Sequence, residues 1–161
     1  IEEDKFFSST KLENLLEEII NSFKETSSKE ITLVSNNDKN KIEIQRSAEM
    51  IYGLRNFIGN AIKFSKSKVN IFLMSDDKEI KIIVNDDGPG FPKDIIEKLG
   101  EPYIKSRSLE LSSNSGLGLG TFLGKTLLER QNAKLLFKDD KNLGGASVVI
   151  SWSPKSILLQ G

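Results

Sequence analysis

The order in which strand-like and helical patterns follow one another is the feature that most constrains the fold of this 161-residue chain. Short apolar runs of the β type come in pairs before and after a long helical pattern, and they do not alternate one by one with helices. A Rossmann or TIM-barrel sheet would need that alternation. The order therefore predicts an α+β fold, a two-layer α/β sandwich in which helices pack on one face of a mixed sheet.

Apolar spacing and turn residues locate the individual elements. Spacings of three and four residues predict four helices, at 10–25, after a Ser47 cap, at 92–99, and from the last glycine cluster to about 131. Alternating or continuous apolar runs predict six strands in three pairs, at 31–34 with 41–45, 69–74 with 80–84, and 134–138 with 146–151. We expect the first two pairs to be hairpins. The serine-rich segment 104–115 is too long and polar for a packed connection, which predicts a mobile loop.

Composition removes several classes of chemistry. The chain has no cysteine and no histidine, which excludes disulfides, thiol catalysis, Cys- or His-ligated zinc and a Ser-His-Asp triad. Its 23 basic residues balance 23 acidic ones, so neither nucleic acid nor a membrane surface is expected as a partner. No apolar run approaches the ~20 residues of a spanning helix. Because the chain begins with Ile1, we expect it to be cut from a longer protein, in which a membrane anchor could lie.

Three polar side chains share one face of the long helical pattern. Asn56, Asn60 and Lys63 stand at positions i, i+4 and i+7, whereas the neighbouring positions are mostly apolar. A solvated helix face is one interpretation. The other is a phosphate site, because amide oxygens are hard ligands that suit Mg²⁺ and a lysine adds a positive charge beside phosphates.

An acidic turn follows the second predicted hairpin, with the sequence Asp86-Asp87-Gly88-Pro89-Gly90. These residues are typical of a tight turn, and a turn alone would explain them. A carboxylate at the end of a strand can also accept a hydrogen bond from an exocyclic amine, the group that distinguishes adenine from guanine. The cluster is therefore a candidate adenine-reading site.

A third cluster, Gly116-Leu117-Gly118-Leu119-Gly120, opens the last predicted helix. The Walker A pattern would need glycine at position 119, and the dinucleotide fingerprint would need it at position 123, but both positions hold leucine. What remains is a glycine-rich helix start, where backbone N–H groups can approach a phosphate at the positive end of the helix dipole. A flexible hinge that caps the helix is the alternative.

Taken together and in order, these clusters resemble the ATP-binding catalytic domain of sensor histidine kinases, which belongs to a larger group with Hsp90, gyrase B and MutL. The segment 56–65 is similar to the N box of that family, 86–91 to its first glycine box and 116–120 to its second. The resemblance covers nearly the whole chain. It implies a Bergerat-type sandwich, ATP and Mg²⁺ as cofactors, and an ATP lid over 104–115.

The resemblance also implies roles for individual residues. Asn60 would ligate Mg²⁺, Asn56 and Lys63 would address the phosphates, Asp86 would read the adenine amine, and Phe64 would line the base pocket. Further nucleotide contacts are implied at Gly88, Gly90, Tyr103, Lys105, Ser106, Arg107, Gly116, Leu117, Gly118, Leu119 and Gly120.

One departure from the family pattern lies between the two glycine boxes. Many relatives carry a phenylalanine-rich segment there, whereas this chain has Leu99-Gly-Glu-Pro-Tyr103. Together with the helix that follows the second glycine box, this segment resembles the redox-responsive RegB/PrrB/ActS subgroup, with Tyr103 in place of the usual aromatic residue. The elements proposed to sense redox in that subgroup lie outside this chain.

A second departure concerns activity. The family phosphorylates a histidine on a separate dimerising domain, and this chain contains no histidine, so it holds no phosphoacceptor and cannot phosphorylate itself. The resemblance implies a linker at 1–9, a catalytic ATP-binding domain at 10–153 and a C-terminal tail at 154–161. It further implies two partners, the dimerisation and phosphoacceptor domain and a cognate response regulator, and a cytoplasmic location within an inner-membrane sensor.

Two other functions remain open from the sequence. A nucleotide-gated protein-interaction module without kinase activity would keep the same binding residues. An ATPase clamp like MutL or gyrase would need a hydrolytic glutamate in the N-box region, and Glu49 stands too far before Asn56 to match it.

Overall fold

The computed structural model describes residues 9–36, 42–99 and 118–159. In chain order the elements are β1 (Ser9–Lys11), α2 (Leu12–Lys24), β2 (Glu30–Ser35), β3 (Glu43–Gln45), α3 (Ala48–Phe64), β4 (Lys68–Ser75), β5 (Ile80–Asp86), α4 (Lys93–Leu99), α6 (Gly118–Glu129), β6 (Lys134–Asp139), β7 (Ala146–Trp152) and α7 (Pro154–Ile157).

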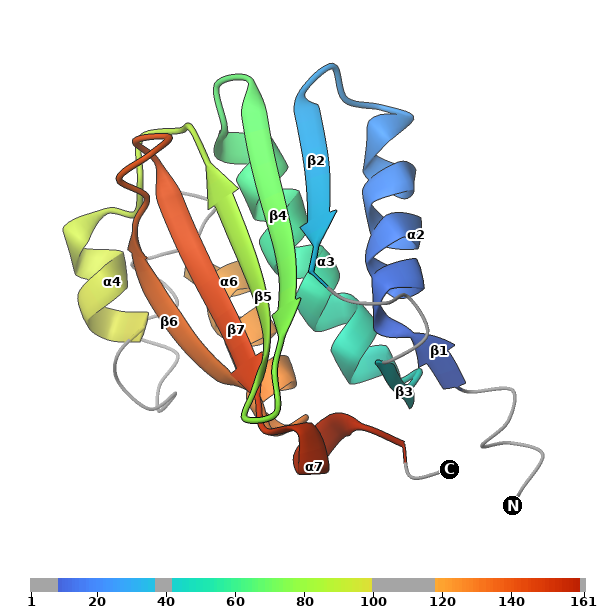
Figure 1. Cartoon of the computed structure of the whole chain (residues 1–161). Helices are drawn as coiled ribbons and strands as arrows, with labels where there is room; N and C mark the ends of the chain where they lie inside the picture. Colours follow the sequence, from blue (N-terminus) through green and yellow to red (C-terminus); the bar gives the residue numbers. More distant parts are fainter. Residues whose placement is uncertain (1–8, 37–41, 100–117, 160–161) are drawn as a thin grey trace.

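Five strands form one mixed sheet in the order β2-β4-β5-β7-β6. The β2–β4 pair is parallel and the other three pairs are antiparallel. Parallel neighbours need a crossover connection, and α3 lies within the segment that joins β2 to β4. In Figure 1, α3 and α6 lie behind the sheet, α2 lies next to β2 at one edge, and α4 lies beside the β6 edge. This arrangement confirms the α+β two-layer sandwich.

Two predictions for the N-terminal part were wrong. The segments 31–34 and 41–45 do not form a hairpin, because β2 pairs with β4 while β3 pairs with β1 in a separate two-stranded sheet. The first helix begins at Leu12, because residues 9–11 are extended and Thr10 faces Ile44 across the β1–β3 pair. Local patterns identify a strand but not its partner, which depends on where the chain returns after α3.

Most of the remaining elements match the predicted ones closely, but the short helix α7 was not predicted. The β4–β5 hairpin forms, as do the two last strands and the Gly144-Gly145 turn between them. Ser47 caps α3 with its side chain, which accepts a hydrogen bond from the Met50 N–H at 3.1 Å. Helix α4 begins directly after Pro92, whose carbonyl accepts hydrogen bonds from the Ile95 and Ile96 N–H groups.

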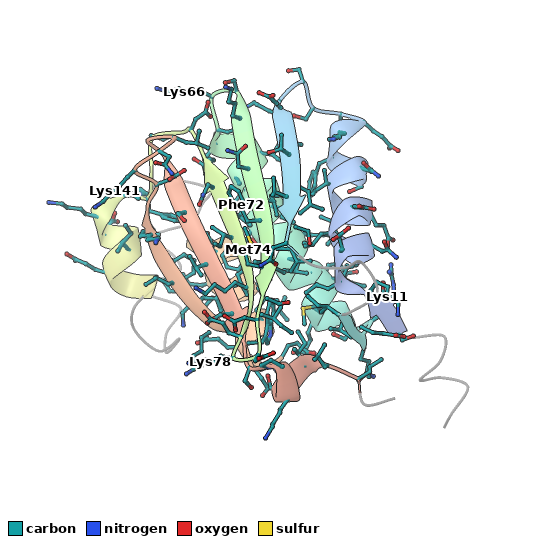
Figure 2. The ribbon with its side chains drawn as sticks, viewed as in Figure 1. Lys11, Lys66, Phe72, Met74, Lys78 and Lys141 are labelled. Atoms are coloured by element: carbon teal, nitrogen blue, oxygen red, sulfur yellow. The ribbon has the colours of Figure 1, made fainter. Side chains whose placement is uncertain are left out.

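The core lies between the sheet and the helices. The apolar stripe of α2 is buried from Leu12 to Ile20, and so is the face of α3 that carries Leu54 and Ile58. Along β4 the side chains alternate, with Ile71 and Leu73 buried beneath the helices and Phe72 and Met74 on the opposite face. Figure 2 shows Phe72 and Met74 on the side of the sheet away from α2 and α3. One continuous core therefore joins both layers.

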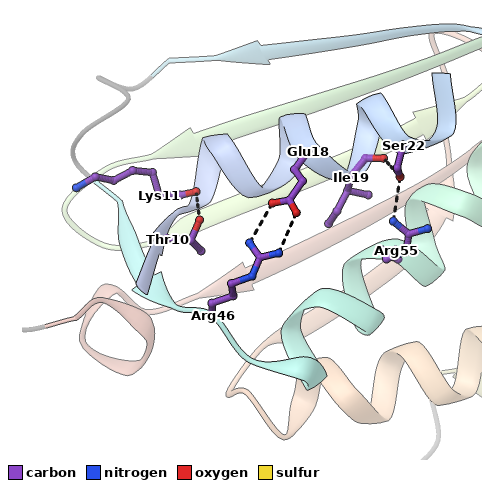
Figure 3. Close-up of polar contacts among 7 residues, drawn as sticks. All are labelled: Thr10, Lys11, Glu18, Ile19, Ser22, Arg46 and Arg55. Atoms are coloured by element: carbon purple, nitrogen blue, oxygen red, sulfur yellow. Dashed lines mark hydrogen bonds and ion pairs between the residues drawn. The ribbon is translucent and has the colours of Figure 1, made fainter. Parts of the chain in front are cut away.

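Polar contacts fix α2 against α3 and the short β1–β3 sheet (Figure 3). The Arg46 guanidinium donates two hydrogen bonds to the Glu18 carboxylate, at 2.9 and 3.0 Å. One helix turn further along, Arg55 of α3 donates to Ser22 Oγ at 2.9 Å and lies 4.9 Å from the centre of the Phe23 ring. These contacts set the position of α3, the helix that carries the predicted N box.

The C-terminal segment also folds onto the body of the chain. After helix α7, Leu158 forms a β-bridge with Ile44, and the Leu159 N–H donates to the Glu43 carbonyl at 2.9 Å. Among the residues that the structure describes, no helix has the length and apolarity that crossing a membrane requires.

Candidate functional site

A pocket of about 170 Å³ opens between the C-terminal half of α3, the ends of β5 and β7, the loop after β5 and the start of α6. Most of its walls are apolar, and a few polar side chains point into it, which is typical of a small-molecule site. Its lining residues are Phe57, Asn60, Ala61, Phe64, Val84, Asp86, Pro89, Gly90, Phe91, Pro92, Thr121, Ala146 and Val148.

Asp86 is the acidic group of this pocket, at the last position of β5. Its side chain is buried, and Oδ1 accepts hydrogen bonds from the Gly88 N–H at 2.9 Å and the Ala146 N–H at 3.2 Å. A carboxylate has about four acceptor positions, so capacity remains for an amino group of a ligand. The two backbone bonds orient the carboxylate before any ligand arrives.

Burial raises the pKa of Asp86 above its ordinary value. The hydrogen bonds from Gly88 and Ala146 oppose that rise, whereas the negative charges of Asp87 and Asp140 add to it. A buried carboxylate with two donors on one oxygen is a strong acceptor for a neutral amine, because few water molecules compete for it. This is the chemistry that reading an adenine amino group requires.

Two glycines allow the backbone to close around Asp86. A Cβ at Gly145 would overlap the carbonyl and carboxylate oxygens of Asp86, and a Cβ at Gly88 would overlap the carbonyl oxygen of Phe64. Gly90, further along the same loop, has a φ of 83°, in the left-handed region that favours glycine. The first glycine box is therefore needed for close packing as well as for a turn.

The two asparagines of α3 face the start of α6. Asn60 Nδ2 donates to Asn56 Oδ1 and to Thr121 Oγ1, both at 3.3 Å. Gly120 and Gly124 lie against Asn56, because a Cβ at either position would be within 3.2 Å of that side chain. The N box and the second glycine box thus meet in space, although more than fifty residues separate them in the sequence.

The predicted site residues fall into four groups. Asn60, Phe64, Asp86 and Gly90 line the pocket, and Gly88 lies directly beside it. Lys63 lies on the exposed side of the same helix end, with its Nζ 5.3 Å from the centre of the Phe64 ring. Outside the described residues are Tyr103, Lys105, Ser106, Arg107, Gly116, Leu117 and the rest of the predicted lid at 104–115. Gly118, Leu119 and Gly120 are the first residues of α6.

Sequence reasoning missed several pocket residues. Phe57, Ala61, Val84 and Val148 belong to apolar patterns that predict core, and nothing in those patterns distinguishes a pocket wall from a packed interior. The Ala146 N–H was missed because its acceptor, Asp86, lies 60 residues earlier. The neighbouring Gly144-Gly145 pair was the one available signal, and it indicated only a turn.

The described part of the site supplies few metal ligands of its own. Among the described residues, no group of three carboxylate, imidazole or thiol side chains lies close enough to hold one. Asn60 nevertheless uses only its amide nitrogen in the hydrogen bonds to Asn56 and Thr121, and an amide oxygen is a hard ligand. Because Mg²⁺ takes one or two protein ligands and completes its shell with phosphates and water, this donor set fits a magnesium–nucleotide complex.

Comparison with known sequences identifies the family. The profile of the histidine kinase-, DNA gyrase B- and HSP90-like ATPases matches residues 48–156, which include all three boxes. The chain belongs to this family. It is 42% identical over 105 residues to the sensor histidine kinase RegB of Cereibacter sphaeroides, and 31% identical over 101 residues to the sensor histidine kinase CpxA of Escherichia coli.

These alignments cover 62% and 63% of this chain, but the chain spans less than a quarter of either relative. The predicted resemblance to histidine kinases and to RegB is confirmed. The chain is homologous to the catalytic ATP-binding part of sensor histidine kinases.

Solved structures show the same fold. A nucleotide-free catalytic domain of the histidine kinase ThkA superposes with a TM-score of 0.71 at 18% identity, over 92% of this chain and 97% of that one. Full-length ShkA in complex with AMPPNP superposes with a TM-score of 0.70 at 20% identity, over 94% of this chain and 31% of that one. The Bergerat-type fold is thus confirmed, including its mixed sheet and one-sided helical layer.

Proposed function

We propose that this chain is the kinase module of a two-component sensor, which binds Mg·ATP and donates the γ-phosphate to a histidine on a separate dimerisation domain. The observation that carries the proposal is the pocket itself. It brings Asp86 of the first glycine box beside Asn60 and Phe64 of the N box, and the family and the named relatives are ATPases and sensor histidine kinases.

Each residue would do a separate part of the binding. Asp86 accepts a hydrogen bond from the adenine amino group, Phe64 forms a wall of the base pocket, and the α6 start presents backbone N–H groups to the phosphates. Asn60 offers its amide oxygen to Mg²⁺, which would neutralise charge on the phosphates when bound. Asn56 and Lys63 complete the phosphate side.

Phosphoryl transfer requires mainly that the reactants are positioned and that the charge on the phosphates is stabilised, so the domain needs no nucleophile of its own. The bond between the γ-phosphorus and the β–γ bridging oxygen breaks, and a phosphorus–nitrogen bond forms to the acceptor imidazole. ADP leaves with the bridging oxygen. The imidazole attacks through its unprotonated nitrogen and then loses the proton of its other ring nitrogen. The acceptor histidine must come from outside this chain, which has none.

The wider assignment follows from the same proposal. The partners would be the dimerisation and phosphoacceptor domain and a response regulator whose aspartate receives the phosphoryl group. The domain would lie in the cytoplasm as part of an inner-membrane sensor. Residues 1–9 would be the linker from the phosphoacceptor domain, and 10–153 the catalytic domain.

The first test is calorimetric titration of ADP into the chain, with and without Mg²⁺, and again with Asp86→Asn. An asparagine would present an amide N–H₂ group or a weaker neutral acceptor to the adenine amine, so we expect the dissociation constant to rise at least about tenfold, equivalent to roughly 1.4 kcal/mol. Binding that is unchanged in Asp86→Asn would contradict the assigned adenine contact.

A second measurement tests transfer. The histidine domain of the longer protein is supplied in trans with ATP, and phosphohistidine is measured. Formation of acid-labile phosphohistidine is the expected result. ADP binding without any transfer would favour the interaction-module alternative.

A further inference from the structure

Asp87, the neighbour of Asp86, uses its carboxylate outside the pocket. Oδ1 accepts hydrogen bonds from three successive backbone N–H groups, those of Lys66, Ser67 and Lys68, at 2.8, 3.0 and 3.2 Å. Oδ2 accepts from the Ser67 hydroxyl at 2.9 Å. The Asp87 N–H donates in turn to the Lys68 carbonyl at 3.3 Å. The Asp87 carboxylate thus binds every backbone N–H group from Lys66 to Lys68, in the turn between α3 and β4.

This turn follows directly after a wall of the pocket. Phe64 is the last residue of α3, and its carbonyl oxygen lies against Gly88, where a Cβ would not fit. From the other side the Lys29 ammonium donates to the Ile62 carbonyl at 3.1 Å and to the Ser65 carbonyl. The end of α3 is therefore held between an anion that follows β5 and a cation that precedes β2.

We propose that Asp87 is a positioning residue of the nucleotide pocket, which holds the end of α3 so that Phe64 stands opposite Asp86. This inference rests on the proposed nucleotide-binding function. Consecutive N–H groups that converge on one oxygen form a strong anion site, and here the anion is built into the chain. Without the Asp87 carboxylate, the N–H groups of the turn would donate to water instead. The position of Phe64 relative to Asp86 would then no longer be fixed.

The geometry explains why the effect should reach the ligand. Asp86 and Asp87 are consecutive. The same backbone segment therefore positions the Asp86 carboxylate in the pocket and the Asp87 carboxylate on the turn between α3 and β4. A displacement of about 1 Å at a binding residue can change rates or affinities strongly. Although burial acts to raise the pKa of Asp87, the hydrogen bonds from the turn outweigh it and hold that pKa well below the ordinary range.

The chain offers a matched control in Asp76. Its Oδ1 accepts hydrogen bonds from the Lys78 and Glu79 N–H groups, at 2.8 and 2.9 Å, in the turn between β4 and β5. This turn lies at the opposite end of the same two strands from the Asp87 turn, as the positions of Lys78 and Lys66 show in Figure 2. Asp76 therefore performs similar turn chemistry far from the pocket.

The test compares ADP affinity in wild type, Asp87→Ala, Asp87→Asn and Asp76→Ala, at a temperature where urea titrations show each variant to be folded. We expect Asp87→Ala to raise the dissociation constant at least about tenfold. Asp87→Asn keeps one carbonyl acceptor and should fall between Asp87→Ala and wild type. Asp76→Ala should stay within about twofold of wild type, although it too loses stability.

If wild type binds ADP, two results would overturn the positioning role of Asp87 and leave the proposed nucleotide-binding function in place. One is an unchanged ADP affinity in Asp87→Ala. The other is an equal loss of affinity in Asp76→Ala, which would show that general stability and not local positioning is measured. If Asp87→Ala does not fold, Asp87→Asn decides, and affinity equal to wild type in that variant overturns the inference. Failure of wild type to bind ADP would instead overturn the proposed function, and this inference with it.

Discussion

At the scale of single residues, two consecutive aspartates show how strongly the surroundings decide what a carboxylate does. Asp86 is buried and its pKa is raised by that burial, whereas Asp87 is partly exposed and its pKa is lowered, against the effect of burial, by backbone and serine donors. The Asp86 carboxylate can still accept a hydrogen bond from a ligand, whereas the Asp87 carboxylate accepts its hydrogen bonds from the turn between α3 and β4. The tight approach of Gly145 to Asp86 completes this arrangement.

We predict that Gly145→Ala weakens ADP binding. The added Cβ would overlap Asp86 and lie 2.6 Å from the Gly88 nitrogen, so the loop or the carboxylate must shift. Overpacking of this kind costs about 1–3 kcal/mol of the free energy of unfolding. We expect the dissociation constant for ADP to rise by about fivefold or more, equivalent to roughly 1 kcal/mol. Urea titration and calorimetry measure the two effects.

Gly144→Ala is the control for this prediction. Gly144 has a φ of 84°, and no atom lies within 4 Å of the place that a Cβ would take, so the substitution costs only backbone strain, about 1–2 kcal/mol. Its ADP affinity should match wild type. Similar losses of affinity in the two variants would show that the β6–β7 turn acts on the pocket through stability alone.

At the scale of elements, helix α3 carries the predicted metal and phosphate ligands and one wall of the pocket. Its start is capped by Ser47, its middle is fixed to α2 through Arg55, and its end is held by Lys29 and Asp87. The helix is therefore anchored at several points along its length. Its N-cap lies at the opposite end of the helix from the pocket, so the anchoring can be changed there without altering a pocket residue.

We predict that Ser47→Ala lowers the free energy of unfolding by about 1 kcal/mol, the usual effect of losing an N-cap hydrogen bond. ADP affinity should not change, because the pocket residues lie in the last turns of α3. Urea unfolding followed by circular dichroism measures the first quantity.

Ser153→Ala is the matched variant for the cap. Ser153 occupies the N-cap position of α7, but its side chain makes no capping hydrogen bond. Its substitution should change the free energy of unfolding by less than about 0.5 kcal/mol. If both serine variants lost the same stability, the Ser47 cap would not be the cause.

At the scale of the whole molecule, one core joins the sheet to α2, α3 and α6, and residues of both layers line the pocket. Trp152, the single tryptophan, is buried in that core and donates its indole N–H to the Gln131 carbonyl at 3.1 Å. Its fluorescence therefore reports on unfolding of the whole domain. This makes the pH dependence of global stability measurable in wild type and variants.

We predict that Asp87 contributes stability at neutral pH that is lost in acid. A carboxylate whose pKa is lower in the folded than in the unfolded state stabilises the fold above the unfolded pKa of about 3.9. That contribution disappears as the pH falls through the folded pKa. The difference in free energy of unfolding between wild type and Asp87→Asn should therefore shrink as the pH is lowered from about 7 to about 3. Trp152 fluorescence in urea measures it.

Asp86 should show the opposite sign, since burial raises its pKa in the folded state. Its contribution is most favourable below the unfolded pKa and is lost as the pH rises through the raised folded value. The same urea series on Asp86→Asn should therefore show a stability relative to wild type that improves with rising pH. A difference that does not depend on pH in either variant would contradict these assignments.

Much of the site could be predicted from local sequence, and the exceptions have a common cause. Asn60 and Asp86 line the pocket, and both were predicted from the sequence because helical spacing and a strand end place them at recognisable local positions. Ala146 and Lys29 were not found, because each acts on a group at least thirty residues away. The early hairpin was wrong for the same reason, since strand pairing is a long-range choice.

The sequence by itself determined most of the elements, the α+β class and the chemical types in the three boxes, because these depend on spacings of one to four residues along the chain. The tertiary structure decided that β2 pairs with β4 across the α3 crossover, that Ala146 orients Asp86, and that Asp87 closes the turn after Phe64. These contacts form only when the sheet and the helical layer pack together. Their partners are chosen by burial and backbone hydrogen bonding in the folded chain, which local patterns do not encode.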